Sequence, residues 1–252
     1  SLSQDYSGAA VTISEIKAGE TNITSSEDYT KTWYKGETEV TELKDVGVYT
    51  LKVTKEGSTF ADATLTINKK ALTVTAKNPS MTYGDTAPAI TDFYTATGWA
   101  TGETAATVGD PVALPTGFDI TSAGTRQFTL QAVELTNYII SVTTPTGTLS
   151  IAKKAITVSP AAVEAITYGD PTPTFTLADY SAGLVDEDEL DGTVSYIVKK
   201  GSTLVENAAT TILAAGTDYT VTAAGLSNDN YNITFAEQSF TVNKKVLTSA
   251  MI

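Results

Sequence analysis

Residues 67–76 read INKKALTVTA, and nearly the same string returns as IAKKAITVSP at residues 151–160. It begins a third time as VNKKVLT at residues 242–248. A string that returns in this way is typical of one supersecondary unit that was copied and joined end to end. The sequence therefore predicts a tandem array of modules that meet at a Lys-Lys pair.

Further landmarks keep their order between the second and third copies. Residues 82–85 and 167–170 both read TYGD, and a proline follows each string at Pro88 and Pro173. The string AGT and then the pair Asn-Tyr come later, at 123–125 and 137–138 in one copy and at 215–217 and 230–231 in the other. The third copy is longer between these landmarks, and we place its insertion at Gly201.

These landmarks divide the chain into three modules and a remainder. We expect a divergent or truncated β-module at 1–68, in which Tyr6 takes the place of the tyrosine of the TYGD string. Two full modules follow at 69–152 and 153–243, and 244–252 is the start of a further repeat or a tail. A chain of 252 residues is long enough for each module to bury a core of its own.

Apolar and polar residues alternate along several segments, as at Tyr49, Leu51 and Val53. Period-2 alternation indicates a strand with one buried and one wet face, and the abundance of Thr, Val, Ile and Tyr agrees with strands. We predict an all-β fold of three tandem immunoglobulin-like β-sandwich modules in an elongated array. The strands predicted in the second module are 71–76, 89–95, 111–115, 117–121, 126–133, 138–143 and 147–152.

A polar stretch at 101–107 and its counterpart at 186–191 fit a helical turn between strands. This keeps β-grasp-like modules open as the alternative fold.

Linkers between modules are nearly absent, because the last strand of one module passes through the Lys-Lys pair into the first strand of the next. Such short connections restrict bending between domains.

Charge and composition argue against several functions. The 29 acidic and 16 basic residues give a net charge of −13, which opposes binding to nucleic acid and insertion into an anionic membrane. The chain has no Cys and no His, the residues most used as nucleophile, general base and zinc ligand. With no nucleophile elbow, phosphate loop or dinucleotide motif either, we expect a monomeric non-enzyme without catalytic residues, cofactor or metal site.

The TYGD strings supply a candidate structural motif. In such a turn a glycine can adopt positive φ, an aspartate can accept backbone N–H bonds, and a tyrosine can cover the end of a core. A calcium site is the alternative, but neither string supplies the several clustered oxygens that calcium needs. The residues of this motif are Tyr83, Gly84, Asp85, Tyr168, Gly169 and Asp170.

Residues 186–191 read DEDELD and form the strongest acidic run. The spacing of an EF-hand fails here, because Leu190 and Ile197 stand at its fifth and twelfth positions. We interpret the run as a solvated polar turn and keep weak calcium binding as the alternative.

Three aromatic residues are candidate ligand-binding residues. Trp33 and Tyr34 are adjacent, so on a strand one of them faces outward, where it can stack on a sugar ring between lysine side chains. The alternative for Trp33 is an inward position that fills the core. Trp99 stands where the third module has Leu184, and this favours core filling.

The Lys-Lys string, TYGD with its proline, AGT and Asn-Tyr together resemble the MBG-type (Tyr-Gly-x type) repeats of bacterial surface and secreted proteins. The resemblance covers about 69–243. It implies extracellular tandem β-modules of adhesin-like proteins and brings no catalytic residues with it.

Two functional hypotheses follow. The first is a non-catalytic structural stalk or adhesion segment of a bacterial cell-surface or secreted protein, which spaces or presents other domains. The second is a carbohydrate- or protein-binding module that uses Trp33, Tyr34 or Trp99, with a host or cell-surface glycan or protein as partner.

Overall fold

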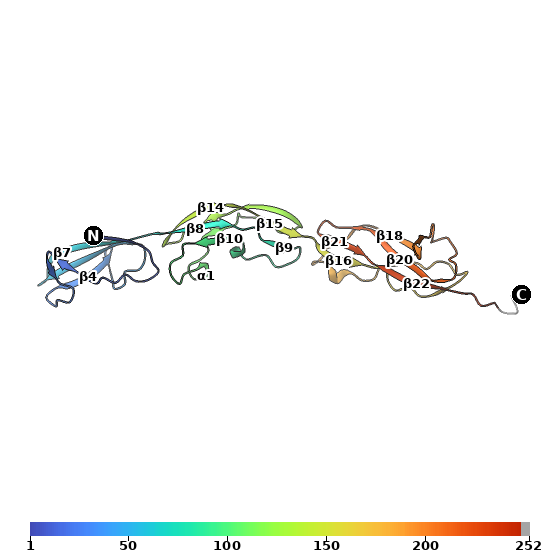
Figure 1. The fold of residues 1–252 in the computed structure, drawn as a ribbon, viewed down its shortest axis with the longest axis horizontal. Helices are drawn as coiled ribbons and strands as arrows, with labels where there is room; N and C mark the ends of the chain where they lie inside the picture. The colour runs from blue at the N-terminus through green and yellow to red at the C-terminus, as the bar shows by residue number, and fades with distance from the viewer. Residues whose placement is uncertain (248–252) are drawn as a thin grey trace. The chain divides into compact units, whose positions relative to one another are not determined.

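The computed structural model describes residues 1–247 (Figure 1). Strands make up 49% of it and helices 4%, so the prediction of an all-β fold is confirmed. The one α-helix of the described residues is α1 (Ala105–Val108), which has four residues. A β-grasp module needs a helix that packs across its sheet, so the β-grasp-like alternative does not fit.

The described chain forms two compact units whose limits do not follow the sequence repeats. One unit contains Ser1–Pro79, Ala87–Phe118 and Arg126–Leu149. The other contains Ser80–Thr86, Asp119–Thr125 and the residues from Ser150 onward. Each unit therefore combines an outer module with one end of the middle module, which indicates close packing at the module junctions.

A five-stranded sheet of order β1-β7-β6-β4-β5 forms the first module. The first strand runs parallel to β7, and the other neighbours are antiparallel. Along β6, Tyr49, Leu51 and Val53 are buried and alternate with residues that are not, as the sequence predicted. The bounds are β1 (Leu2–Asp5), β4 (Thr30–Lys35), β5 (Thr38–Val40), β6 (Gly47–Lys55) and β7 (Ser58–Asn68).

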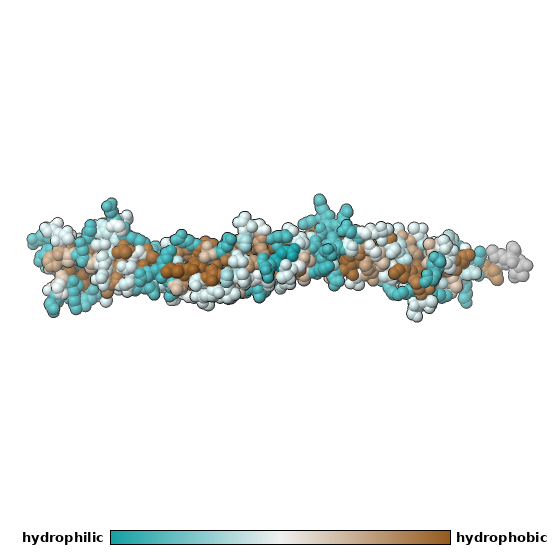
Figure 2. Space-filling view, turned by 90° about the horizontal axis from the view of Figure 1, so that it is seen from above, coloured by the Kyte–Doolittle hydropathy of each residue, from teal (hydrophilic) through white to brown (hydrophobic). Residues whose placement is uncertain are grey.

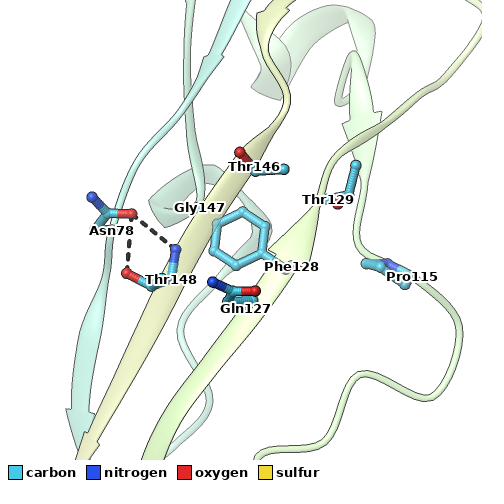
Figure 3. A pocket seen from close by; sticks show the side chains of 8 residues that line it. All are labelled: Asn78, Pro115, Gln127, Phe128, Thr129, Thr146, Gly147 and Thr148. Carbon is cyan, nitrogen blue, oxygen red and sulfur yellow. Dashed lines mark hydrogen bonds between the residues drawn. The ribbon is translucent and has the colours of Figure 1, made fainter.

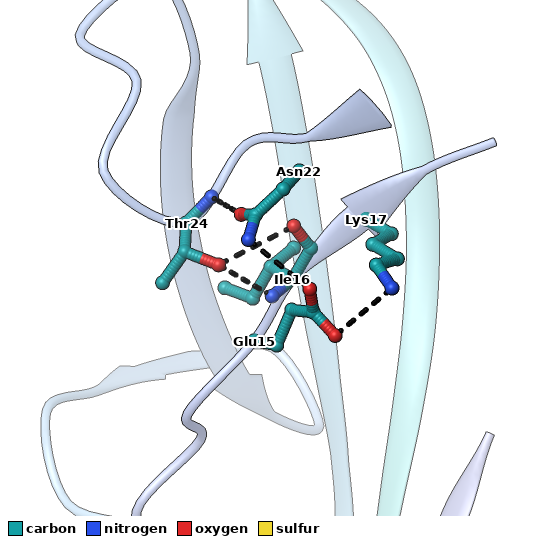
Figure 4. Close-up of polar contacts among 5 residues, drawn as sticks. All are labelled: Glu15, Ile16, Lys17, Asn22 and Thr24. Carbon is teal, nitrogen blue, oxygen red and sulfur yellow. Dashed lines mark hydrogen bonds and ion pairs between the residues drawn. The ribbon is translucent and has the colours of Figure 1, made fainter. Parts of the chain in front are cut away.

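A small hairpin of β2 (Lys17–Ala18) and β3 (Thr21–Asn22) is held by side chains around it (Figure 4). The Thr24 hydroxyl accepts the Ile16 N–H at 2.7 Å, and Asn22 Oδ1 accepts the Thr24 N–H at 2.9 Å. Asn22 Nδ2 donates to Glu15 at 3.1 Å, and Lys17 pairs with the same carboxylate at 3.0 Å. The side-chain oxygen and nitrogen of Asn22 are therefore both used in hydrogen bonds within this loop.

The middle module places its first strand in the centre of a three-stranded sheet. This strand, β8 (Lys70–Ala76), lies antiparallel to β10 (Tyr94–Thr97) and parallel to β14 (Tyr138–Thr144). A second sheet has the order β12-β15-β9, and β9 runs parallel to β15. The remaining bounds are β9 (Ser80–Thr82), β11 (Val112–Ala113), β12 (Gly124–Thr129), β13 (Gln131–Ala132) and β15 (Thr146–Ala152).

The strand predictions for this module are wrong at 117–121 and wrong in part at 89–95 and 111–115, the last of which holds only Val112–Ala113. Residues 117–121 form no strand, because Gly117 has φ of 75° and a turn closes where Phe118 N–H donates to the Pro115 carbonyl at 3.2 Å. The range 89–95 contains the 3-10 helix η1 (Ile90–Asp92), so the strand starts only at Tyr94. The helical turn expected at 101–107 is present as α1, but its counterpart at 186–191 holds a turn without a helix.

The third module repeats the plan of the middle one. Its first strand, β16 (Lys154–Val158), runs parallel to β21 (Tyr231–Phe235), as β8 does to β14. The predicted insertion at Gly201 forms the turn of a hairpin between β18 and β19. A five-stranded sheet has the order β17-β22-β20-β18-β19, with bounds β17 (Ile166–Thr167), β18 (Asp191–Lys200), β19 (Thr203–Leu204), β20 (Gly216–Ser227) and β22 (Glu237–Asn243). The 3-10 helix η2 (Ser181–Gly183) lies between β17 and β18 in the chain.

One hydrophobic cluster crosses the sequence boundary between the first and middle modules. Its buried residues come from both modules: Tyr6, Leu43, Tyr49, Leu65, Ile67, Leu72, Ala100, Leu135 and Tyr138. The expectation that each module buries a core of its own is therefore wrong at this junction. A separate cluster around Tyr219 and Phe240 fills the third module.

Candidate functional site at the module junctions

The TYGD strings form tight turns at one end of their modules. Asp85 accepts the Thr82 N–H at 3.0 Å, and Asp170 accepts the Thr167 N–H at 2.8 Å. The glycine between them has positive φ in both turns, 84° and 99°. Each turn therefore fixes the direction in which its tyrosine leaves the module.

Tyr83 leaves the middle module and meets two residues of the third. Its hydroxyl donates to Asp188 Oδ2 at 2.8 Å, and the Tyr231 hydroxyl donates to the same oxygen at 2.7 Å. The two rings pack edge to face, with centroids 5.7 Å apart and an interplanar angle of 80°. The Val185 N–H donates to the Tyr231 hydroxyl at 2.7 Å, so this oxygen both donates and accepts.

The same arrangement joins the first module to the middle one. The hydroxyls of Tyr6 and Tyr138 donate to the two carboxylate oxygens of Glu103, and the rings again lie 5.7 Å apart at 80°. The Ala100 N–H donates to the Tyr138 hydroxyl at 2.9 Å. We call this set, two tyrosines around one carboxylate, the junction triad.

We call Tyr138 and Tyr231, which lie in the same module as the carboxylate, the acceptor tyrosines. The asparagine before each of them reaches back across the junction. Asn137 Oδ1 accepts the Val46 N–H at 3.0 Å, and Asn230 Oδ1 accepts the Ala123 N–H at 2.9 Å. The backbone carbonyl of each asparagine accepts the backbone N–H of the second lysine of the Lys-Lys pair, Lys70 or Lys154, at 2.9 Å. The Lys-Lys pair, the AGT string and the Asn-Tyr pair are therefore all used at the second junction, together with the turn that carries Tyr83.

Burial and the neighbouring carboxylate keep the triad tyrosines protonated. Burial first, and then the hydrogen bond to Glu103, raises the pKa of Tyr6 and of Tyr138 to about 12. The same causes, with Asp188 as partner, raise the pKa of Tyr231 to about 12. For Tyr83 the hydrogen bond to Asp188 raises the pKa most, followed by burial. All four phenols are thus hydrogen-bond donors throughout the physiological pH range.

Glycine lets the modules approach closely at these turns. A Cβ on Gly84 would lie 2.4 Å from Val185 Cγ2, and a Cβ on Gly8 would lie 3.1 Å from Ala100 Cβ. Both glycines also have positive φ, which L side chains rarely adopt. Gly8 and Gly84 therefore each serve both the turn and the contact.

The three aromatic candidates for ligand binding are half-buried. Trp33 packs against two core clusters, and Trp99 packs edge to face on Tyr138 with centroids 5.2 Å apart. Tyr34, the neighbour of Trp33 on β4, has the Lys52 ammonium 4.8 Å above its ring. Their role in binding stays a prediction.

A cavity of about 480 Å³ opens in the middle module and has no charged residue in its lining (Figure 3). Asn78 Oδ1 accepts the Thr148 N–H at 2.8 Å and the Thr148 hydroxyl at 3.2 Å. Phe128 lies so close to Gly147 that a Cβ there would be 2.4 Å from its ring. Its ring also packs edge to face with Phe93 and Phe118, so it is engaged in the core.

A second cavity, of about 630 Å³, lies in the third module and is more aromatic. Phe175 and Tyr196, with ring centroids 5.6 Å apart, form part of its wall, together with the exposed Leu204. On the face seen in Figure 2, hydrophobic residues occur as patches with polar residues between them.

Within residues 1–247 no group of three or more acidic side chains is arranged to hold a metal ion. In the acidic run, Asp188 is engaged by the two tyrosines of its triad. The described residues also include no helix with the length and apolar character needed to cross a bilayer.

The carboxylates are the junction residues that sequence reasoning missed. Glu103 and Asp188 lie in the two polar stretches that were aligned as counterparts, but they differ in type and in surroundings. Asn-Tyr was recognised only as a landmark. The signal that returns with each junction is a tyrosine with a glycine one or two residues later, an acidic residue and the pair Asn-Tyr.

The sequence profile of the MBG domain of the YGX type matches residues 72–150 and 156–241. The chain belongs to this family. The resemblance stated from the sequence is thereby confirmed, and Tyr83 of the second junction triad stands in a Tyr-Gly string inside the matched region. No curated protein matches the chain.

Three solved structures are similar along most of the chain. Immunoglobulin domains 1–4 of Sidekick-1 are 12% identical with a TM-score of 0.23, covering 97% of this chain and 72% of that one. A three-immunoglobulin structure of titin is 10% identical with a TM-score of 0.27, covering 90% of both chains. A Bacteroides ovatus SGBP-B, solved with a mixed-linkage heptasaccharide, is 13% identical with a TM-score of 0.22, covering 96% of this chain and 65% of that one. At these identities and TM-scores they add nothing to the functional argument.

Membership of this family indicates an extracellular adhesion or structural module. Proteins of this kind are typically non-catalytic.

Proposed function

We propose that this chain is a stiff spacer in a bacterial cell-surface or secreted protein, which presents other domains and performs no catalysis. The observation that carries this proposal is the recurrence of the junction triad at both module boundaries. Neighbouring modules are thereby joined by side-chain contacts as well as by the covalent chain.

The triad suits a spacer because it restrains rotation between neighbouring modules. A flexible peptide link alone leaves such rotation free, whereas each junction here adds two tyrosine–carboxylate bonds and one asparagine–amide bond. A typical intramolecular hydrogen bond contributes about 1 kcal/mol net, and bonds to a charged group contribute more. A few such bonds, together with ring packing, hold one relative orientation against thermal motion.

Small-angle X-ray scattering on the intact chain and on Tyr83→Ala tests the proposal. We expect Tyr83→Ala to scatter as a more flexible particle than the intact chain. Tyr168→Ala is the matched control, because its tyrosine occupies the same turn but contacts no carboxylate among the described residues, and we expect it to leave the scattering unchanged. A collapsed particle, or identical flexibility in all three proteins, would contradict the proposal.

Carbohydrate or protein binding is the second candidate function. Trp33 and Tyr34 favour it, since both are half-exposed and lie on one strand near lysine side chains. We would titrate the intact chain with a panel of cell-wall and capsular polysaccharides and follow tryptophan fluorescence. A shift that disappears in Trp33→Phe supports binding, and unchanged fluorescence with every glycan counts against it.

A further inference from the structure

The third module carries the same turn as the other two, but its tyrosine is open to solvent. Tyr168 is 49% exposed, whereas Tyr6 is 3% and Tyr83 is 9% exposed. Its backbone is in the same position as theirs, because the Tyr168 N–H donates to the Asn243 carbonyl at 2.8 Å and the Tyr83 N–H donates to the Ala152 carbonyl at 2.8 Å. The difference is therefore in what surrounds the ring and not in the turn itself.

The other half of a junction is also present beside Tyr168. Ala215 corresponds to Ala123 in the AGT string, and Asn230 accepts the N–H of Ala123 at the occupied junction. Tyr168 and Ala215 line a shallow cavity of about 450 Å³ with Lys244, Lys245 and Leu247. We call Tyr168, Gly169 and Ala215 the donor end of the third module.

The residues that leave this end are apolar and exposed. Val246 is 79% and Leu247 is 71% exposed. Leu247 corresponds to Leu72 and Ile156, which are 0% and 6% exposed. Their strands β8 and β16 begin a module and lie parallel to β14 and β21 of that same module. Leaving such a side chain in water forfeits the burial that its counterparts have.

We call the end of a module that carries the triad carboxylate and the Asn-Tyr pair its acceptor end. We propose that the donor end binds the acceptor end of a further YGX-type module, for which residues 246–247 begin the first strand. The partner supplies a carboxylate for the Tyr168 hydroxyl and an Asn-Tyr pair. The asparagine accepts the Ala215 N–H, and the tyrosine packs edge to face on Tyr168. This inference rests on the proposed spacer function and names the partner of its third module.

A second copy of this chain does not fit the donor end as well. The acceptor ends of the middle and third modules are occupied by Tyr6 and Tyr83. The first module contains no Asn-Tyr pair, so it offers no acceptor end. The chemistry thus favours a module that continues from the Lys-Lys pair over self-association.

Tyrosine nitration with tetranitromethane, read by peptide mass spectrometry, tests the inference. We would compare the 252-residue chain with an extended chain in which residues 1–243 continue directly into a second copy of residues 153–243. The appended copy carries Tyr168→Phe, so that only one Tyr168 is measured. We expect Tyr168 to react readily in the first protein and roughly tenfold more slowly in the second, as for a junction that is open about 10% of the time.

Two controls separate docking from folding. The buried Tyr219, which donates to Ala214 within its own module at 2.9 Å, stays unreactive if the appended copy folds. Placing Asp188→Ala in the appended copy alone removes the acceptor, and we expect it to restore the reactivity of Tyr168 while Tyr219 stays protected.

The outcomes distinguish this inference from the proposed function. If Tyr168 reacts equally in both proteins while Tyr6 and Tyr83 are protected, the donor end is not a docking site and the spacer proposal stands. If Tyr6 and Tyr83 react as readily as Tyr168 in the 252-residue chain, the junctions are open and the spacer proposal itself fails.

Discussion

The two occupied junctions share one geometry but differ in their surroundings. In the first, Glu103 gives each tyrosine its own oxygen, whereas in the second Tyr83 and Tyr231 share one oxygen of Asp188. The first also has Trp99 packed on its acceptor tyrosine, where the second has Leu184.

The constant part of the comparison is the pair of tyrosines, and the variable part is the apolar residues around it. Ring separation and angle are equal although the carboxylate side chains differ by one methylene. We infer that the triad sets the orientation of neighbouring modules, while the surrounding hydrophobic residues set how much free energy the junction contributes.

The largest effect is expected from Tyr138→Ala, with Tyr231→Ala as its counterpart. Removing a buried aromatic ring costs about 3–5 kcal/mol of unfolding free energy. We expect Tyr138→Ala to cost more, because its ring also supports Trp99 and a cluster shared by two modules. Urea denaturation of both variants measures this, and equal losses would remove the distinction between the junctions.

The carboxylates should come next. Glu103→Ala and Asp188→Ala each leave two tyrosine hydroxyls without their acceptor, and an unsatisfied buried polar group costs about 1–3 kcal/mol. The exchange Asp188→Glu should be tolerated better than Asp188→Ala, since the first junction uses glutamate. Thermal unfolding compares the three, and equal melting of Asp188→Glu and Asp188→Ala would argue against a role for the carboxylate.

Gly84→Ala and Gly169→Ala compare an occupied turn with the open one. Both force a non-glycine residue into positive φ, at about 1–2 kcal/mol. Only Gly84→Ala also brings a Cβ to 2.4 Å from Val185, whereas at Gly169 the nearest group is the Lys245 ammonium at 3.8 Å. Differential scanning calorimetry should therefore show the greater loss for Gly84→Ala, and the reverse order would contradict the proposed contact.

Alkaline pH should weaken the junctions in a predictable range. The folded pKa of Tyr6, Tyr138 and Tyr231 is raised from 10.0 to about 12, so their stabilisation is fully present below pH 10 and is lost as the pH rises toward 12. Spectrophotometric titration of the phenols in the intact chain, and then in Glu103→Gln, measures this. Glutamine keeps a neutral acceptor, and we expect it to lower the pKa of Tyr6 and Tyr138 but not that of Tyr231.

The smallest effect is expected at the exposed Lys-Lys ion pairs. Lys69 lies 3.4 Å from Glu134, and Lys153 lies 3.9 Å from the fully exposed Asp229. Exposed pairs of this kind contribute little and are screened by salt. Lys153→Ala should therefore melt as the intact chain does in 0.15 M salt, a physiological ionic strength.

Much of the fold was predictable because it depends on local pattern. The alternation in β6 and the Lys-Lys strings indicated strands and repeats correctly, since side-chain period and strand burial are local properties. The strand predicted at 117–121 failed because Pro115 and Gly117 impose a turn on an otherwise strand-like composition.

The junction triad was not predictable in the same way. Its members come from different modules, and Glu103 lies 97 positions from Tyr6, while Asp188 lies 105 positions from Tyr83. A polar residue in a short loop looks solvated when its sequence neighbours are the only guide. Only the folded chain brings these partners together.

The parallel pairing of each full module's first strand has a mechanical consequence. When a tensile load enters through β8 or β16, their parallel partners β14 and β21 lie alongside over several consecutive residues. Pulling along such a ladder strains its hydrogen bonds in shear and together, so that they do not open one after another as in a hairpin peeled from its end. We therefore expect the rupture force of the modules, measured by single-molecule pulling, to be higher than their equilibrium stability suggests.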